Sequence, residues 1–251
     1  MLQFGLFQWM IVSLCALMIG FSKAGIMGAA APVVPLLAAV MPARQSIGFL
    51  LPMLIIGDIT ATLFWWRFAD WKELFRIFPW MLVGVFTGYQ LLGYMTDRTL
   101  MAVIGMIVLF LVMLHLWQQR RPDPSVLLSR NSWFTRITGF MAGTTSMLAN
   151  SAGPIMVLYL LVMGLDKRRF IGTAALFFLV MNCVKLPFSV GLSLVTPQSL
   201  ITNLALAPLI VLGGFIGAVL VRHIPQRSFD LVMQVMTALM GCWLCLSALA
   251  V

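Results

Sequence analysis

Long apolar stretches follow one another along nearly the whole chain, and short polar or proline-containing segments separate them. A stretch of about 17 to 25 apolar residues is long enough to cross a bilayer as a helix. Runs such as residues 100–114 are apolar on every face, whereas the strands of an outer-membrane barrel alternate in polarity. The pattern therefore predicts helical elements at 2–20, 24–41, 46–66, 77–95, 99–117, 137–149, 150–165, 170–192, 199–221 and 228–250.

Two of these elements, 137–149 and 150–165, are shorter than an ordinary membrane span. A helix needs about 20 residues to cross the hydrocarbon core of a bilayer. We therefore expect these two elements to be half-helices or a re-entrant pair.

The composition places the chain in the membrane class. Of its 251 residues, 62% are hydrophobic and only 9% are charged, and the mean hydropathy is +1.04. A soluble domain needs a polar surface, which this composition does not supply. The predicted fold class is an all-α polytopic membrane protein. The first apolar stretch follows no Lys or Arg and shows no small-x-small cleavage pattern, so it is expected to be a retained span and not a signal peptide.

Lysine and arginine fall mainly on one side of this predicted topology. When alternate connections between the predicted spans are assigned to opposite sides of the membrane, one side receives thirteen of the sixteen basic residues, Lys23 among them. The other side receives only Arg44 and Arg98. The sixteenth, Lys185, falls inside an apolar run. The bias predicts that the first side is cytoplasmic, that both termini lie outside, and that the protein is a multi-pass protein of the cell inner (plasma) membrane. The net charge of +9 then reflects topology and not a nucleic-acid partner.

The two halves of the chain share a spacing pattern. The segment "ARQSIGFLLPMLIIGD" ends in Asp58 and "KRRFIGTAALFFLVMN" ends in Asn182, and each has a glycine ten residues before its end. A Pro-x4-Gly-x3-Gly pattern begins at Pro79 and again at Pro208. Its two glycines share a helix face and are expected to let helices pack closely, a role that we favour over ligand contact. Agreement at two places indicates a duplication.

The second copy is expected to be inverted relative to the first. An odd number of elements per half would turn it over, and the loop charges agree, because "RFADWKELFR" is rich in Lys and Arg while its counterpart "SLVTPQSL" has none. We predict two inverted repeats of about five helical elements each, with broken or re-entrant helices opening each half. The predicted parts are a first membrane repeat at 1–117, a cytoplasmic linker at 118–136 and a second, inverted membrane repeat at 137–251.

The segments that open the halves, "KAGIMGAAAPVVPLL" and "GTTSMLANSAGPIMVLYLL", combine glycine, small residues and proline. Both residue types weaken a helix, so breaks near the membrane middle are expected, and matching breaks indicate a transporter's substrate site. A new helix N-terminus at a break offers free amides to an anion. The candidate substrate-binding residues here are Gly25 and Gly28 in the first segment and Asn150, Ser151 and Gly153 in the second. The side chains of Asn150 and Ser151 are expected either to contact the substrate or to cap their own helix.

Polar residues inside the apolar runs form a second kind of candidate site. Asp58 and Asn182 each lie roughly 18 Å into a core about 30 Å thick, and Lys185 shares a helix face with Asn182. Lys185 has three readings: it snorkels to the interface, it forms an ion pair with Asp58, or it contacts a substrate or ion. Asp58 is also a candidate proton carrier, because burial raises the pKa of a carboxyl group.

These segments resemble the sulfite exporter TauE/SafE family of membrane permeases over nearly the whole chain. The resemblance is carried by "GIMGAAAPVVPLL", by "SMLANSAGPIMVLYLLVMGLDKRRFIGTAALFF", by the "NCVK" stretch and by the two Pro-x4-Gly-x3-Gly patterns. It implies a secondary transporter, associated with export of small sulfur-containing anions such as sulfite, sulfoacetate or another sulfonate.

The leading functional hypothesis is a proton-coupled or potential-driven carrier that moves a small anion by alternating access. Lys185 and the amides at the breaks would hold the anion, Asn182 and Asn150 would orient it, and Asp58 would couple protonation to the conformational change. The alternative is a non-transporting membrane protein that acts in assembly or handles a metal or a thiol, for which nineteen methionines and "CWLC" are the evidence.

An enzyme is not expected, because the sequence has no paired carboxylates, no Ser/His arrangement and no metal-binding run. We predict no catalytic residue, no metal site and no cofactor. The expected partners are a small anionic substrate and the lipid bilayer, without nucleic acid, and a homodimer remains open.

Overall fold

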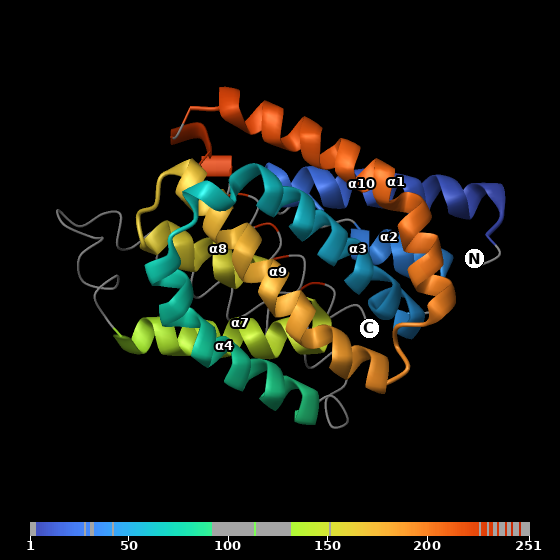
Figure 1. Cartoon of the computed structure of the whole chain (residues 1–251), viewed down its shortest axis with the longest axis horizontal. Coiled ribbons are helices and arrows are strands. Elements are labelled where there is room, and N and C mark those ends of the chain that lie inside the picture. Colours follow the sequence, from blue (N-terminus) through green and yellow to red (C-terminus); the bar gives the residue numbers. More distant parts are fainter. Residues whose placement is uncertain are drawn as a thin grey trace. The chain divides into compact units, whose positions relative to one another are not determined.

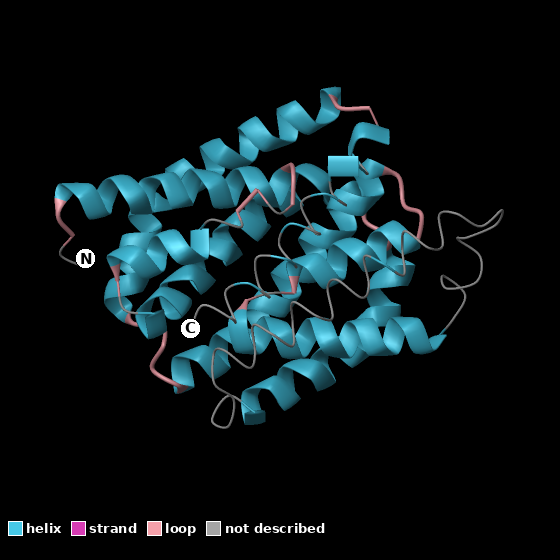
Figure 2. Cartoon of the chain, turned by 180° about the vertical axis from the view of Figure 1, so that it is seen from behind, coloured by secondary structure: helices cyan, strands magenta, loops and turns pink. Residues whose placement is uncertain are grey.

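The computed structural model describes residues 4–27, 29–30, 33–41, 43–91, 113, 132–150, 152–225, 227–229, 231–232, 235, 239, 242 and 246. Every regular element in these ranges is a helix, as Figures 1 and 2 show. The elements are α1 (Leu6–Ala24), α2 (Val33–Val40), α3 (Ala43–Trp65), the short 3-10 helix η1 (Trp66–Phe68), α4 (Trp71–Leu91), α7 (Ser132–Ala149), α8 (Gly153–Val162), α9 (Lys167–Gly191) and α10 (Pro197–His223). The predicted all-α class is confirmed for this part of the chain.

Polar side chains fix where three of the long helices begin. The Asp70 carboxylate accepts hydrogen bonds from the backbone at the start of α4, and the Asp166 carboxylate does the same at the start of α9. Thr196 and Ser199 form a reciprocal capping box on α10, with Pro197 in the first turn. These caps satisfy amides that would otherwise have no partner inside the helix.

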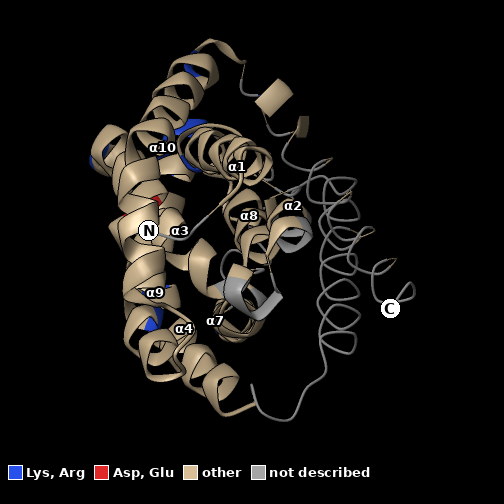
Figure 3. Cartoon of the chain, turned by 90° about the vertical axis from the view of Figure 1, so that its right-hand side faces the viewer, with Lys and Arg blue, Asp and Glu red and all other residues tan. Residues whose placement is uncertain are grey.

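Within the part of the chain that the structure describes, four helices are long and apolar enough to cross a membrane: the 19 residues Leu6–Ala24, the 21 residues Gly48–Phe68, α9 with 25 residues and α10 with 27 residues. They agree with the predicted elements 2–20, 46–66, 170–192 and 199–221. Few described residues carry a charge, and most of the ribbon in Figure 3 has the tan colour of the uncharged residues. The predicted elements 99–117 and 228–250 lie outside the described residues or contain only isolated described positions.

Several predicted elements differ from the structure in their bounds; α4, for example, begins at Trp71 and not at 77. Within the element predicted at 24–41, α1 ends at Ala24 and α2 spans only Val33–Val40, which agrees with the break expected in this segment. Glycine and proline in this segment disfavour a continuous helix. The element predicted at 137–149 begins earlier, at Ser132, and so reaches 18 residues, whereas α8 is short with 10 residues. The chain leaves the helical conformation between α7 and α8, as predicted.

The described chain forms two compact units, and each unit combines segments from both predicted halves. The first comprises residues 1–69 and 171–225, and the second comprises residues 70–170 and 226–251. In the first unit, α1, α2, α3 and α10 share one apolar core, in which Val12, Leu37, Met53 and Ile210 are buried. In the second unit, α4 packs along α7, and α7 packs on α8. Figure 1 shows α1 beside α10 and α4 beside α7.

Glycines allow the closest helix contacts in both units. A Cβ atom on Gly213 of α10 would lie 2.1 Å from the Leu17 backbone oxygen of α1, and one on Gly84 of α4 would lie 2.1 Å from the Phe140 backbone oxygen of α7. Only a residue without a side chain fits there. The packing role predicted for the Gly-x-x-x-Gly pairs is therefore confirmed at both places.

Candidate functional site

Asp58 is fully buried in α3, and both of its carboxylate oxygens contact donors. The Lys23 Nζ atom, from the last turn of α1, lies 2.7 Å from Asp58 Oδ1. Asn182 of α9 donates from Nδ2 to Asp58 Oδ2 at 2.6 Å. Residues of three helices thus surround one carboxylate, which meets the requirement that a buried charge be paired and hydrogen-bonded.

Lys185 extends this arrangement along α9. Its ammonium donates to Asn182 Oδ1 at 3.4 Å, and the side chain is only 2% exposed. An ammonium only donates and a carboxylate only accepts, so the Asn182 amide fits between them in one orientation, with its nitrogen toward Asp58 and its oxygen toward Lys185. We call the connected set Lys23, Asp58, Asn182 and Lys185 the central polar cluster.

Helix geometry explains how Lys23 reaches the interior. A helical side chain leans toward the N-terminus of its own helix, so a lysine in the last turn of α1 points back along that helix. Its ammonium also lies 4.3 Å from the ring centroid of Phe178, a cation-π distance. A Cβ atom on Gly57 would lie 3.2 Å from Lys23 Cγ, so glycine at this position leaves room for the lysine stem.

The helices α3 and α9 run antiparallel through the cluster. Near the start of α3, a Cβ atom on Gly48 would lie 1.7 Å from the backbone oxygen of Leu194, just beyond the end of α9. Near the start of α9, a Cβ atom on Gly172 would lie 2.5 Å from the backbone oxygen of Trp65, at the end of α3. Between these two close approaches, α3 and α9 meet at the hydrogen bond between Asp58 and Asn182.

The contacts of Lys185 bear on two of its three interpretations, snorkelling and an ion pair with Asp58. Its side chain is buried and contacts Asn182, so the snorkelling interpretation is wrong. The ion pair that Asp58 makes here is with Lys23, and Lys185 joins the carboxylate through the Asn182 amide. Sequence reasoning missed Lys23 as a site residue because it counted this lysine as a loop charge.

The remaining predicted site residues lie elsewhere or outside the described residues. Gly25 directly follows α1, where a Cβ atom would lie 2.8 Å from Gly217 Cα, so its evident role is close backbone packing. Gly28 and Ser151 lie outside the described residues, as does the second cysteine of "CWLC". Asn150 and Gly153 belong to the second compact unit.

Asn150 forms the end of α7. Its φ of 52° is left-handed, and its backbone N–H donates to the Ser146 backbone oxygen at 3.0 Å, an arrangement that ends helices. Gly153 opens α8, and a Cβ atom there would meet no other atom within 4 Å, so there is open space beside it.

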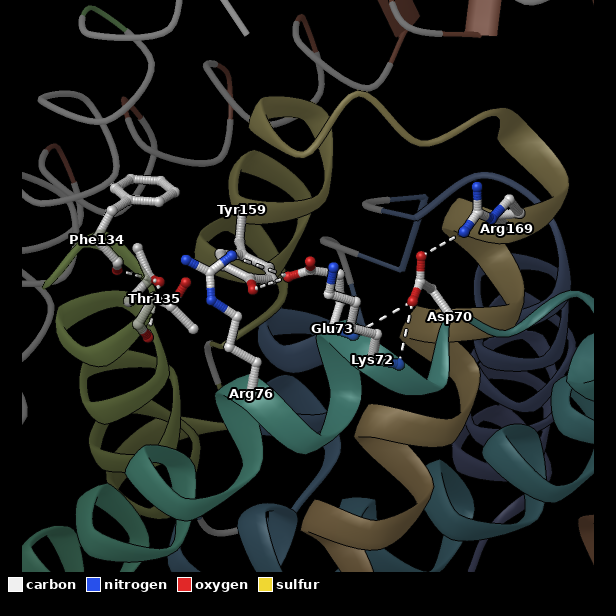
Figure 4. A network of polar contacts seen from close by, with 9 residues as sticks. Asp70, Lys72, Glu73, Arg76, Phe134, Thr135, Tyr159 and Arg169 are labelled. Carbon is white, nitrogen blue, oxygen red and sulfur yellow. Dashed lines mark hydrogen bonds and ion pairs between the residues drawn. The ribbon is translucent and has the colours of Figure 1, made fainter. Parts of the chain in front are cut away.

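The second unit has a polar network of its own (Figure 4). The Tyr159 hydroxyl on α8 donates to Glu73 Oε2 on α4 at 2.6 Å, and Arg76 Nη1 lies 3.7 Å from the same oxygen. Asp70, which caps α4, also pairs with Arg169 of α9. These contacts hold α8 and the start of α9 against the first turns of α4.

Comparison with known proteins gives one match. The family model described as Sulfite exporter TauE/SafE matches residues 12–244, a range that contains the whole central polar cluster. No curated protein and no solved structure matches the chain.

Proposed function

Because the chain belongs to the sulfite exporter TauE/SafE family of multi-pass membrane transporters of anions, we propose that it carries a small sulfur-containing anion, such as sulfite, sulfoacetate or another sulfonate, at the central polar cluster. It is a transporter and not an enzyme. In this proposal Lys185 is the principal cation for the substrate and Asn182 orients it.

The observation that carries this proposal is a buried lysine within a connected polar cluster inside long apolar helices. Placing a lysine at the centre of a membrane span costs about 2.5 to 3.5 kcal/mol on insertion scales, so such residues mark functional sites. An ammonium donates strong charge-assisted hydrogen bonds to anionic oxygens, and sulfite and sulfonates present three such oxygens.

The same contacts give Asp58 a coupling role in the proposal. A proton on the carboxylate would weaken its contact with either Lys23 or Asn182, because one oxygen now pairs with the Lys23 ammonium and the other accepts from the Asn182 amide. Protonation would therefore loosen α3 from α1 or from α9. Proton binding and movement of these helices become linked in this way, which is what a proton-coupled carrier requires.

The proposed architecture is a pair of inverted repeats related across Asp58 and Asn182. Its support is that two segments with matching spacing, α3 and α9, run antiparallel, and that the start of each meets the end of the other. Such a frame suits alternating access about a central site. The membrane potential, negative inside, would favour efflux of an anion by about 2.3 kcal/mol per charge per 100 mV.

Flux of labelled sulfite, sulfate and a small sulfonate in proteoliposomes tests this function. The variants are Lys185→Ala, Asp58→Asn and Lys72→Ala, where Lys72 is an exposed lysine on α4 that serves as the matched control. We expect the wild type and Lys72→Ala to carry at least one of these anions and Lys185→Ala to lose most of the flux. Asp58→Asn is expected to carry the anion without response to a proton gradient.

Unchanged flux in Lys185→Ala, together with an unchanged response to the proton gradient in Asp58→Asn, would refute the assigned site. A wild-type protein that moves none of the three anions would refute transport of this substrate class.

A further inference from the structure

Three ionisable side chains meet in the central polar cluster, and their charges do not cancel. Lys23 and Lys185 each carry one positive charge when protonated, while Asp58 carries one negative charge when ionised. All three are largely removed from water, with exposed fractions of 15% for Lys23, 0% for Asp58 and 2% for Lys185. With all three groups ionised, the cluster as a whole holds a single positive charge within apolar helices.

We propose that this cluster selects singly charged anions, so that among small sulfur-containing anions it carries monosulfonates and hydrogensulfite and excludes dianions such as sulfoacetate. The inference rests on the proposed function, because it specifies the charge of the anion that the same site carries. A monoanion at Lys185 brings the sum of charges to zero, which is the least costly state for buried charges.

A second negative charge on the substrate would face the Asp58 carboxylate. That carboxylate lies only one amide group away from Lys185, since Asn182 contacts both through its two polar atoms. Like charges at this separation in a poorly solvated site repel each other strongly. The Lys23 ammonium lies against the other Asp58 oxygen, so it offsets this repulsion only in part.

Other described charges of the first unit do not change this sum. Arg67, Arg222 and His223 are exposed and lie at helix ends. Charges in contact with water are screened within about a nanometre. The selection therefore depends on Lys23, Asp58 and Lys185.

Substitutions that change the charge of the cluster are expected to change its preference between monoanions and dianions. Asp58→Asn keeps the shape of the side chain and raises the sum of charges in the cluster to two, so a dianion becomes the better match. Adding Lys23→Gln to Asp58→Asn returns the sum to one. The double variant should then regain the monoanion preference although both members of the ion pair are changed.

Methanesulfonate and sulfate provide a matched pair of probes, because both are tetrahedral at sulfur and differ by a methyl group in place of one anionic oxygen. Flux of each is measured in the same proteoliposomes, and the ratio of the two rates is compared between proteins, so that a general loss of activity cancels. For the wild type we expect methanesulfonate to be carried at least tenfold faster than sulfate. Asp58→Asn should lower this ratio at least tenfold, and the double variant should restore it.

Three results would overturn the inference. One is a wild type that prefers sulfate over methanesulfonate, a measurement that does not depend on any variant folding. Another is a ratio that stays at the wild-type value in Asp58→Asn. The third is a double variant that keeps the Asp58→Asn ratio, which would mean that contact with the carboxylate and not the sum of charges sets selectivity. If the wild type carries dianions but no monoanion, only this inference is refuted. If it carries no small sulfur-containing anion at all, the proposed function is refuted as well.

Discussion

The ion pair between Lys23 and Asp58 is expected to contribute strongly to folding stability. At the observed 2.7 Å, two unit charges attract each other by about 6 kcal/mol at an effective dielectric constant near 20, before the cost of removing them from water. Removing one member of a buried pair costs about 3 to 5 kcal/mol, because the other charge stays buried without compensation. Replacing both members by neutral side chains costs much less.

The test is a double-mutant cycle with Lys23→Met, Asp58→Asn and the combination of the two. Thermal unfolding of the detergent-solubilised protein is followed by tryptophan fluorescence, for which the chain has eight tryptophans. Each kcal/mol shifts Tm by roughly 2 to 4 °C in a chain of this size, so each single variant should unfold roughly 6 to 20 °C below the wild type. The double variant should unfold above both single variants. Strictly additive shifts in the double variant would refute the coupling, because independent residues add and interacting ones do not.

Two further predictions concern packing and the second unit. Gly213→Ala should lower the free energy of unfolding by about 1 to 3 kcal/mol, because the added methyl would press on the Leu17 backbone oxygen. The control Gly191→Ala, which has open space around it, should not destabilise the protein. Equal shifts of Tm in the two variants would contradict this packing. Tyr159→Phe should lower the free energy of unfolding by about 1 to 3 kcal/mol, since it leaves the Glu73 carboxylate without its hydroxyl donor. In a protein that already carries Glu73→Gln, the same substitution should have a smaller effect in the same unfolding assay. A Tyr159→Phe protein as stable as the wild type would exclude a contribution of this hydrogen bond to stability.

Much of the helical frame follows from the sequence, because apolar length and capping residues decide where membrane helices lie. The correspondence between Asp58 and Asn182 came from spacing alone, and the structure brings these two side chains into a hydrogen bond. The shared face of Asn182 and Lys185 also follows from their three-residue separation, and these side chains are in contact.

The partner of Asp58 could not be predicted in the same way. Lys23 stands at a helix end next to a predicted loop, where the positive-inside rule already accounts for a lysine. Its contact with Asp58 depends on how α1 packs against α3, and a glycine, Gly57, leaves the space for its stem. Close backbone approach of this kind is a property of tertiary packing, which the periodicity of a single helix does not contain. The eight-residue length of α2 could not be predicted either, because glycine and proline indicate that a helix is broken but not at which residues it begins and ends.

Contact between Lys185 and the transported anion is tested most directly by binding, which does not involve the steps of transport. Methanesulfonate is titrated into the detergent-solubilised protein, and Kd is obtained from the concentration dependence of Tm. One charge-assisted hydrogen bond contributes about 1.5 to 3 kcal/mol, so Lys185→Met should weaken Kd at least about tenfold, while the exposed control Lys72→Met should match the wild type. A Kd for Lys185→Met equal to that of the wild type would contradict the account.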